Sequence, residues 1–255
     1  RSSDLHPHRS AASIGNRRSP RGARTARPRQ SRVGGDGPGV QVLRTHRVVA
    51  AWSRWFRNSA VVNSDGSPMV VYHGTTATFD AFEPFYRKGE MLGFGMHFAE
   101  DVEIAAKYAF EKGVARKGNT PRLIAAFLSV QNPLIADAIV SEGSREFALA
   151  KKLWTKTFRT TKDVDGVPCV YLQNAIDKTD SKRAERLIRD AGYDGVQYMA
   201  SLRAAAAPGY VHETGRSLAW IVFEPTQIKS ATDNVGTFDP TRASIVNPPR
   251  RMRRR

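Results

Sequence analysis

The chain has 255 residues, 40% of them hydrophobic and 25% charged, which is the balance of a soluble globular protein with one substantial core. Its single cysteine, Cys169, excludes an intramolecular disulfide framework and a Cys-rich zinc site, and suits a reducing compartment. The net charge of +16 is typical of a nucleic-acid-binding protein, but residues 1–47 contribute +9 and residues 242–255 contribute +6, which leaves +1 for residues 48–241.

Residues 1–47 form the first segment, which is rich in Arg, Ser, Gly and Pro. Because it has almost no large apolar side chains to offset the entropy of ordering, we expect a disordered tail, and residues 247–255 a second one. Two interpretations of the tails stay open: contact with nucleic-acid phosphates or another acidic surface, or solvated segments without a partner. The chain starts without Met and without the apolar core of a signal peptide, so we expect a fragment or a processed product.

Between the tails, residues 48–246 are expected to form one domain of short strands and a few helices. Amphipathic spacing predicts helices over 46–58, 102–112, 144–159 and 180–191. Runs of β-branched and aromatic residues predict strands at 69–73, 95–99, 122–130, 196–199, 218–223 and 227–231. The longest apolar run, 123–130, is too short to span a membrane. Hairpins link the strands as often as helices do, which favours the α+β class over a doubly wound sheet.

Three local patterns follow one another along this domain: VVYHGTT at 70–76, GFGMHFAEDVEIAAKYA at 93–109 and AWIVFEPTQIKSA at 219–231. Their order and spacing resemble the ADP-ribosyltransferases of the diphtheria-toxin and poly(ADP-ribose) polymerase branch. The resemblance is closest to the ADP-ribosyltransferase domains of phage and mobile-element polyvalent proteins, and it covers about residues 60–245. It implies the ADP-ribosyltransferase fold, a split core of two small antiparallel sheets around an NAD cleft with helices packed outside.

The resemblance also implies cleavage of NAD at the nicotinamide–ribose bond. That chemistry needs a site that holds the carboxamide, sandwiches the flat ring and stabilises positive charge on the ribose. By resemblance, His73 binds the adenosine ribose, and Gly74, with Thr75 beside it, presents its backbone to the carboxamide, where a glycine lets the ligand come close. The alternative is a structural His at a strand end followed by a turn Gly.

Tyr108 lies eleven residues after His97, the spacing at which the family places a helix Tyr whose ring stacks on nicotinamide. The alternative is a core Tyr beside Ile104 on one helical face. His97 stands where many relatives carry another Tyr, and an imidazole there can stack on the ligand or hydrogen-bond a phosphate. Ala105 stands where relatives often carry a Ser that binds the carboxamide, so that hydrogen bond is missing.

The third pattern departs from the family at Ala219, where relatives usually carry a Glu that binds the 2′-hydroxyl of the nicotinamide ribose. We assign Gln227 as the third catalytic residue. Eight extended residues span roughly 26 Å, so Gln227 can serve only if the chain folds back after Pro225. Glu213 is a second candidate, and Glu224 ranks last because its strand parity is wrong. A structural role for Gln227, in satisfying backbone groups, stays equally open.

The resemblance thus implies an enzyme that transfers ADP-ribose from NAD to a protein or nucleic-acid acceptor. It implies no metal and no membrane contact, and a place in the cytoplasm of a bacterial host, with delivery or use by a phage or mobile element. Acceptor choice is expected to depend on the loops at 80–93 and 201–216. The alternatives are an NAD glycohydrolase, a degenerate NAD-binding module, which Ala219 permits, and a basic nucleic-acid-binding protein that acts through its Arg tails.

Overall fold

The computed structural model describes residues 48–87, 92–115, 120–154, 156–201, 216–233 and 238–246. All of them belong to the compact unit Pro38–Arg255. The tails predicted at 1–47 and 247–255 lie outside the described residues, as does Glu213. Among the described helices, none is long and apolar enough to cross a membrane.

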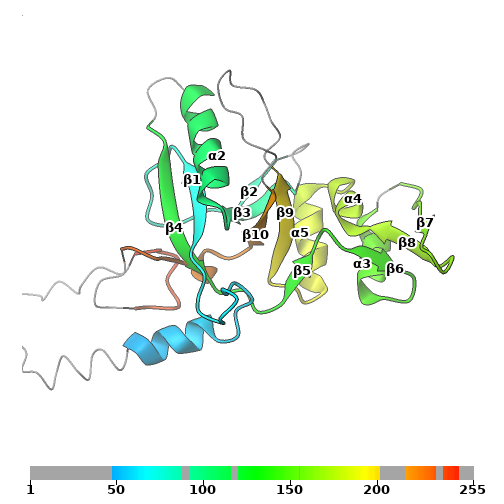
Figure 1. Ribbon diagram of the computed structural model, residues 1–255, viewed down its shortest axis with the longest axis horizontal. Helices are drawn as coiled ribbons and strands as arrows, with labels where there is room; N and C mark the ends of the chain where they lie inside the picture. The colour runs from blue at the N-terminus through cyan, green and yellow to red at the C-terminus, as the bar shows by residue number, and fades with distance from the viewer. Residues whose placement is uncertain are drawn as a thin grey trace, which may run out of the picture. The chain divides into compact units, whose positions relative to one another are not determined.

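The described chain begins with a helix over 48–56 and continues with short strands and helices in mixed order (Figure 1). The α+β class predicted from the sequence is confirmed. The later helices are α2 (Val102–Ala115), α3 (Arg145–Leu153), α4 (Leu172–Asp177) and α5 (Ser181–Asp190), with a 3-10 turn, η1 (Pro225–Gln227). The strands are β1 (Val71–Thr75), β2 (Phe85–Tyr86), β3 (Phe94–Ala99), β4 (Arg122–Leu128), β5 (Pro133–Ile135), β6 (Ile139–Ser141), β7 (Thr161–Lys162), β8 (Pro168–Tyr171), β9 (Gly195–Ser201), β10 (Arg216–Val222) and β11 (Ile228–Ser230).

Eight strands form one sheet in the order β11-β4-β1-β3-β10-β9-β5, with β2 paired to β3. Its two halves almost separate between β1 and β3. β1 pairs with β4 along its whole length, Val71–Thr75. Over their described residues, β1 and β3 pair at one position only, Tyr72 with Ala99. The resemblance implies two small antiparallel sheets, whereas the structure joins them as two halves of one sheet at this pair, with β5 parallel to β9.

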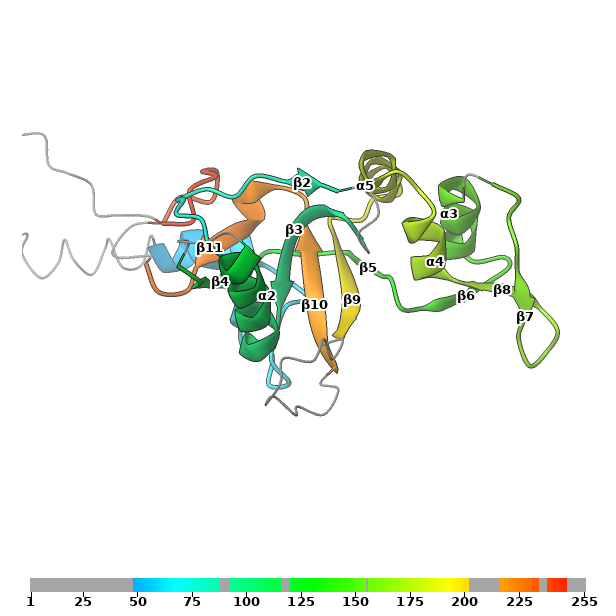
Figure 2. The same cartoon turned by 90° about the horizontal axis from the view of Figure 1, so that it is seen from above.

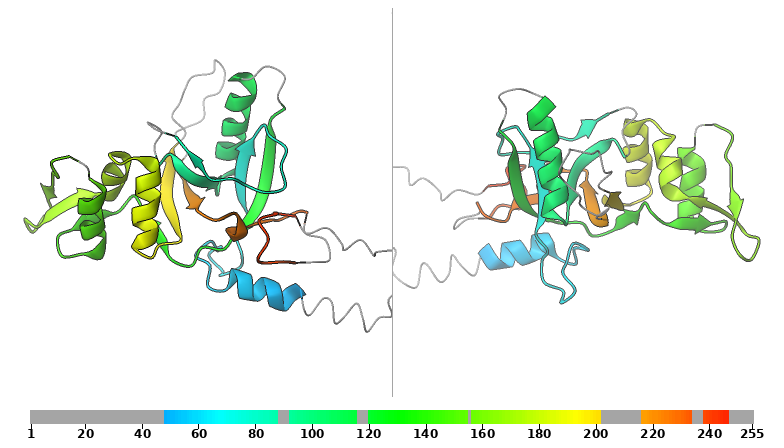
Figure 3. Two further views of the ribbon diagram at one scale, coloured as in Figure 1. Left: turned by 180° about the vertical axis from the view of Figure 1, so that it is seen from behind. Right: turned by 45° about the horizontal axis from the view of Figure 1, so that its top comes forward.

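A three-stranded sheet, in the order β6-β8-β7, packs with α3 and α4 beyond α5, on the side away from α2 (Figures 2 and 3). The sequence patterns predicted a single helix over 144–159 here, but α3 ends at Leu153. The chain turns back because the ring of Phe158 packs edge-on against Phe147 and Trp154, with centroid distances of 5.4 and 5.6 Å. The short strands β5 to β8 escaped prediction because none carries a long apolar run.

Helix α2 packs directly on β1 and β4 (Figure 1), and Gly74 is the residue that permits this packing. A Cβ atom at Gly74 would lie 1.8 Å from the carbonyl oxygen of Ala105 and 2.8 Å from the nitrogen of Ala109. Any side chain at this position would push the helix off the strand. The approach of a ligand was our reason to expect a glycine here, but the structure gives a different one, the contact between β1 and α2.

Replacing Gly74 with Ala is expected to lower the free energy of unfolding by about 3 kcal/mol, the upper end of what overpacking costs, because the clash is with backbone atoms. Urea unfolding followed by circular dichroism measures the loss. The control is Gly66→Ala, where a Cβ meets nothing within 4 Å and only the strain of a φ of +81° remains, which costs about 1 kcal/mol. Equal stabilities of the two variants would contradict this account of α2.

Tyr193 joins the turn before β9 to helix α3. Its hydroxyl donates a hydrogen bond to Oε1 of Glu146 at 2.5 Å, and the guanidinium of Arg145 lies 4.7 Å from the centre of its ring. Burial, together with the hydrogen bond to the Glu146 carboxylate, raises the pKa of Tyr193 to about 12.

This pKa predicts an alkaline loss of stability. The unfolded chain releases the phenol proton near pH 10 while the native state retains it, so the stabilisation is complete below pH 10 and is lost as the pH rises to about 12. The expected slope is about 1.4 kcal/mol per pH unit. Urea midpoints measured across this range should fall less steeply for Tyr193→Phe than for the unmodified chain, and identical slopes would refute the assignment.

Candidate active site

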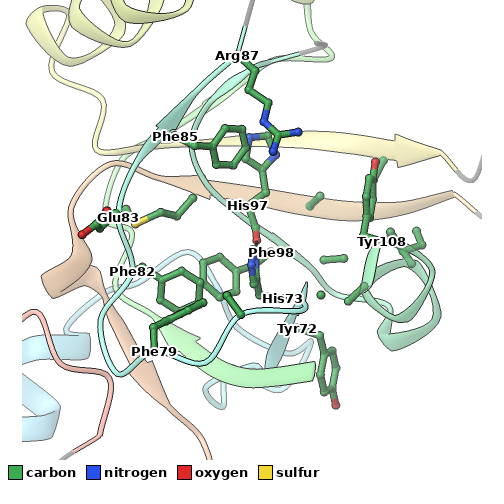
Figure 4. Close-up of a pocket in the computed structure, with 18 of the residues that line it drawn as sticks. Tyr72, His73, Phe79, Phe82, Glu83, Phe85, Arg87, His97, Phe98 and Tyr108 are labelled. Atoms are coloured by element: carbon green, nitrogen blue, oxygen red, sulfur yellow. Dashed lines mark hydrogen bonds between the residues drawn. The ribbon is translucent and has the colours of Figure 1, made fainter. Parts of the chain in front are cut away.

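A cavity of about 900 Å³ opens where the two halves of the sheet separate. Its walls come from β1, β3, β9, β10, α2 and the segment 77–87, so both halves contribute (Figure 4). This volume is in the usual range for a cleft that holds a small molecule or cofactor.

His73 lies on β1 at the mouth of the split. Its Nδ1 donates a hydrogen bond to the carbonyl oxygen of His97 at 2.7 Å, and its ring packs edge-on against Phe82 at 5.0 Å (Figure 4). Because a carbonyl can only accept, the proton of a neutral ring is on Nδ1, and Nε2 is then an acceptor. His73 therefore holds β3 through one ring nitrogen while the ring lines the cavity.

His97 lines the cavity from β3, with its ring stacked on Phe85 at a centroid distance of 5.1 Å and an interplanar angle of 25° (Figure 4). Its Nε2 lies 3.0 Å from the carbonyl oxygen of Phe94, and its Nδ1 lies 3.0 Å from the hydroxyl of Tyr198. Both ring nitrogens thus have protein partners. Of the two roles considered for His97, this geometry favours stacking over a phosphate contact.

Tyr108 lines the cavity from α2, with 51% of its surface exposed. Ile104, one turn earlier, is buried at 2% exposure, so the interpretation of Tyr108 as a core residue beside it is wrong. Figure 4 shows the ring of Tyr108 on the α2 side of the cavity, with His97 and Phe85 on the other side. The exposed ring offers a flat apolar face to a ligand.

Thr75 does not line the cavity with His73, His97 and Tyr108. It is buried at 6% exposure, and its Oγ1 accepts a hydrogen bond from the backbone nitrogen of Ala77 at 3.1 Å. Ala77 lines the cavity and Thr75 does not. The hydroxyl of Thr75 thus shapes the turn after β1.

Ala219 lies on the floor of the cavity at 1% exposure, paired with Ala99 on β3 and Tyr198 on β9. Ala105 lines the cavity from α2. Ala105 and Ala219, two of the positions where the sequence departs from the resembled pattern, therefore both line the cavity.

Gln227 lies away from the cavity lining, in η1. Its Oε1 accepts hydrogen bonds from the backbone nitrogens of Phe223 and Glu224, at 3.1 and 2.9 Å. Its Nε2 donates to the carbonyl oxygens of Ser129 and Asp194, at 3.0 and 2.8 Å. The amide of Gln227 thus satisfies four backbone groups, which favours the structural alternative.

Glu224 is also outside the cavity lining, and its carboxylate forms an ion pair with Arg189 of α5.

The cavity lining includes polar residues that the sequence patterns did not single out: Glu83, Arg87, Glu111 and Tyr198. Glu83 and Arg87 lie in the loop 80–93, on which acceptor choice was expected to depend. Helical spacing can find Glu111, because it lies three residues after Tyr108 on the same helix. Tyr198 cannot be found in this way, because the register of β9 against β10 is not a local property of the sequence. Burial, the largest cause, raises the pKa of Tyr198, so its hydroxyl keeps its proton at neutral pH.

A comparison with known families matches residues 63–238 to the family described as ADP-ribosyltransferase in polyvalent proteins. The chain belongs to this family. The match contains every residue placed above in the cavity of this ADP-ribosyltransferase domain. No curated protein was found to match the chain. Among the described side chains, no group of three or more His, Cys, Asp or Glu residues could hold a metal ion.

Replacing Gln227 with Ala tests its structural role in the ADP-ribosyltransferase domain. Loss of four hydrogen bonds to backbone groups, three of them partly buried, is expected to lower the free energy of unfolding by about 2–4 kcal/mol. Thermal melts measure this loss, and Arg242→Ala, which removes an ion pair exposed on both sides, should cost less than about 1 kcal/mol. A Gln227→Ala variant of unchanged stability would return Gln227 to consideration as a ligand-binding residue.

Proposed function

We propose that the domain takes NAD into this cavity, breaks its nicotinamide–ribose bond and transfers ADP-ribose to a protein or nucleic-acid acceptor. The observation that supports the proposal is the convergence of His73, Gly74, His97 and Tyr108 from β1, β3 and α2 on one cavity. Their residue types suit a flat, polar and charged ligand of the size of NAD.

The nicotinamide ring finds flat faces in the cavity. Tyr108 contributes an exposed ring, and the stacked pair of His97 and Phe85 lies on the opposite side (Figure 4). Stacking between aromatic rings contributes about 0.5–1.5 kcal/mol beyond the buried area. The backbone of Gly74 and the ring of His73 border the same space, where the resemblance implies contacts to the carboxamide and to the adenosine ribose.

In the proposed reaction the C1′–N bond breaks, and its electron pair leaves with nicotinamide. The ribose C1′ gains positive charge, and the acceptor forms the new bond to C1′ as it loses a proton. Side chains that bind the ring and the ribose contribute by holding this geometry and by excluding water. The carboxylates lining the cavity in the described chain are Glu83 and Glu111, and they supply negative charge in the absence of a carboxylate at position 219.

Nicotinamide release from NAD by the full chain tests the proposal. We expect His73→Ala and Tyr108→Ala each to lower kcat/KM by about tenfold or more, because each removes a contact to the reacting ligand. Tyr108→Phe is the matched control, since it keeps the stacking ring and should retain most of the activity. Circular dichroism checks that His73→Ala is folded, because His73 also bonds β3.

Other outcomes would replace the proposal. Release of nicotinamide with water as the acceptor, and no labelled macromolecule, would indicate an NAD glycohydrolase. Binding of NAD without turnover would indicate a binding module, a candidate that the methyl group of Ala219 on the cavity floor favours. A full chain that neither binds NAD nor turns it over would refute the proposal.

The family description supports a place for the domain in a polyvalent protein, and we propose that a phage or mobile element uses it in the bacterial cytoplasm. The Arg-rich composition of 1–40 and 247–255 supports a second contact, with nucleic acid. Deleting both segments should abolish retention on DNA or RNA and leave NAD turnover unchanged. Retention that survives the deletion would assign nucleic-acid binding to the domain itself.

A further inference from the structure

The floor of the cavity is a row of positions on three neighbouring strands. Ala99 of β3 pairs with Ala219 of β10, and Ala219 pairs in turn with Tyr198 of β9. Two residue pairs further along, His97 of β3 pairs with Ile221. His97 and Tyr198 therefore belong to strands that are separated by β10.

The side chains of His97 and Tyr198 nevertheless meet, with Nδ1 and Oη 3.0 Å apart. Neighbouring strands lie about 4.8 Å apart, so the strands that carry them are roughly 9.6 Å apart. The contact bridges β10 beside Ala219, whose side chain is a single methyl group. The small side chain of Ala219 and the hydrogen bond between His97 and Tyr198 therefore occur together at one place on the cavity floor.

The direction of this hydrogen bond follows from its neighbours. The carbonyl of Phe94 can only accept, so Nε2 of a neutral His97 carries the proton and Nδ1 has a lone pair. Tyr198 must then donate its hydroxyl hydrogen to His97. The phenol oxygen keeps its acceptor capacity, and Tyr198 lines the cavity. Burial raises the pKa of Tyr198, so the donated hydrogen is present at neutral pH.

We propose that Tyr198, oriented by His97, accepts a hydrogen bond from a ribose hydroxyl of the dinucleotide bound in this cavity, beside Ala219. A sugar hydroxyl that reaches the floor meets the methyl groups of Ala99, Ala200 and Ala219, and the phenol oxygen of Tyr198 is the acceptor next to them. Tyr198 is then a substrate-binding residue and His97 a positioning residue. This inference rests on the proposed use of NAD.

The test compares two ligands on the full chain carrying Tyr198→Phe. NAD has the ribose and nicotinamide alone does not, so the variant should bind NAD about tenfold more weakly by calorimetry and bind nicotinamide with unchanged affinity. The matched control is Tyr193→Phe, which also removes the hydroxyl of a buried tyrosine bonded to a side chain, outside the cavity. It should change neither affinity.

A second variant tests the orienting role of His97. His97→Phe keeps a ring beside Phe85 but removes the Nδ1 acceptor, so we expect a several-fold weaker affinity for NAD. In the Tyr198→Phe background the same change should have no further effect, because the two residues act through one hydrogen bond. Additive losses would overturn the positioning role.

The outcomes separate this inference from the proposed function. If the unmodified chain binds NAD and Tyr198→Phe binds it equally well, the role of Tyr198 is refuted and the use of NAD stands. A parallel loss of NAD and nicotinamide affinity would also refute it, since the hydroxyl would then act on the shape of the site. If the unmodified chain does not bind NAD, both proposals fail.

Discussion

The separation of β1 from β3 is the feature on which the site depends. The two strands share one backbone pair, Tyr72 with Ala99, and beyond it the imidazole of His73 donates to the carbonyl oxygen of His97. The His73 side chain thus provides a hydrogen bond to the His97 carbonyl at the point where the backbone pairing of β1 and β3 ends. The cavity exists because the sheet opens here without leaving this group unpaired.

The two sides of the opening are held by different means. On one side α2 lies against β1 because Gly74 has no side chain, and this contact sets where Tyr108 stands. On the other side the side chains of His97 and Tyr198 meet across β10, which carries Ile221 opposite His97 and the small Ala219 opposite Tyr198. Packing against Gly74 fixes the wall formed by α2, so that wall is sensitive to added side-chain volume. A hydrogen bond fixes the wall formed by His97 and Tyr198, so that wall is sensitive to the loss of a single polar atom.

Local patterns predicted α2, α3, α5 and most of the long strands, because strand alternation and helical spacing act over a few residues, but they did not predict the short α4. The choice of His73 and Tyr108 came from the family resemblance. Local patterns could not predict contacts between strands that are distant in the sequence. Extended-chain length showed that Gln227 can serve in the site only if the chain folds back after Pro225, but it could not show that the amide bonds Ser129 and Asp194 instead. Tyr198 was missed for the same reason, since its place beside Ala219 depends on strand register.

The packing of Gly74 against α2 also bears on how such domains are recognised. A glycine after the strand histidine is required by the architecture, whether or not the chain has kept its chemistry. A lineage that lost the ability to process its substrate would still be under pressure to keep this residue, because any replacement would dislodge the helix. The histidine–glycine pair therefore indicates common descent and the ability to fold. Evidence for catalysis has to come from the side chains around it.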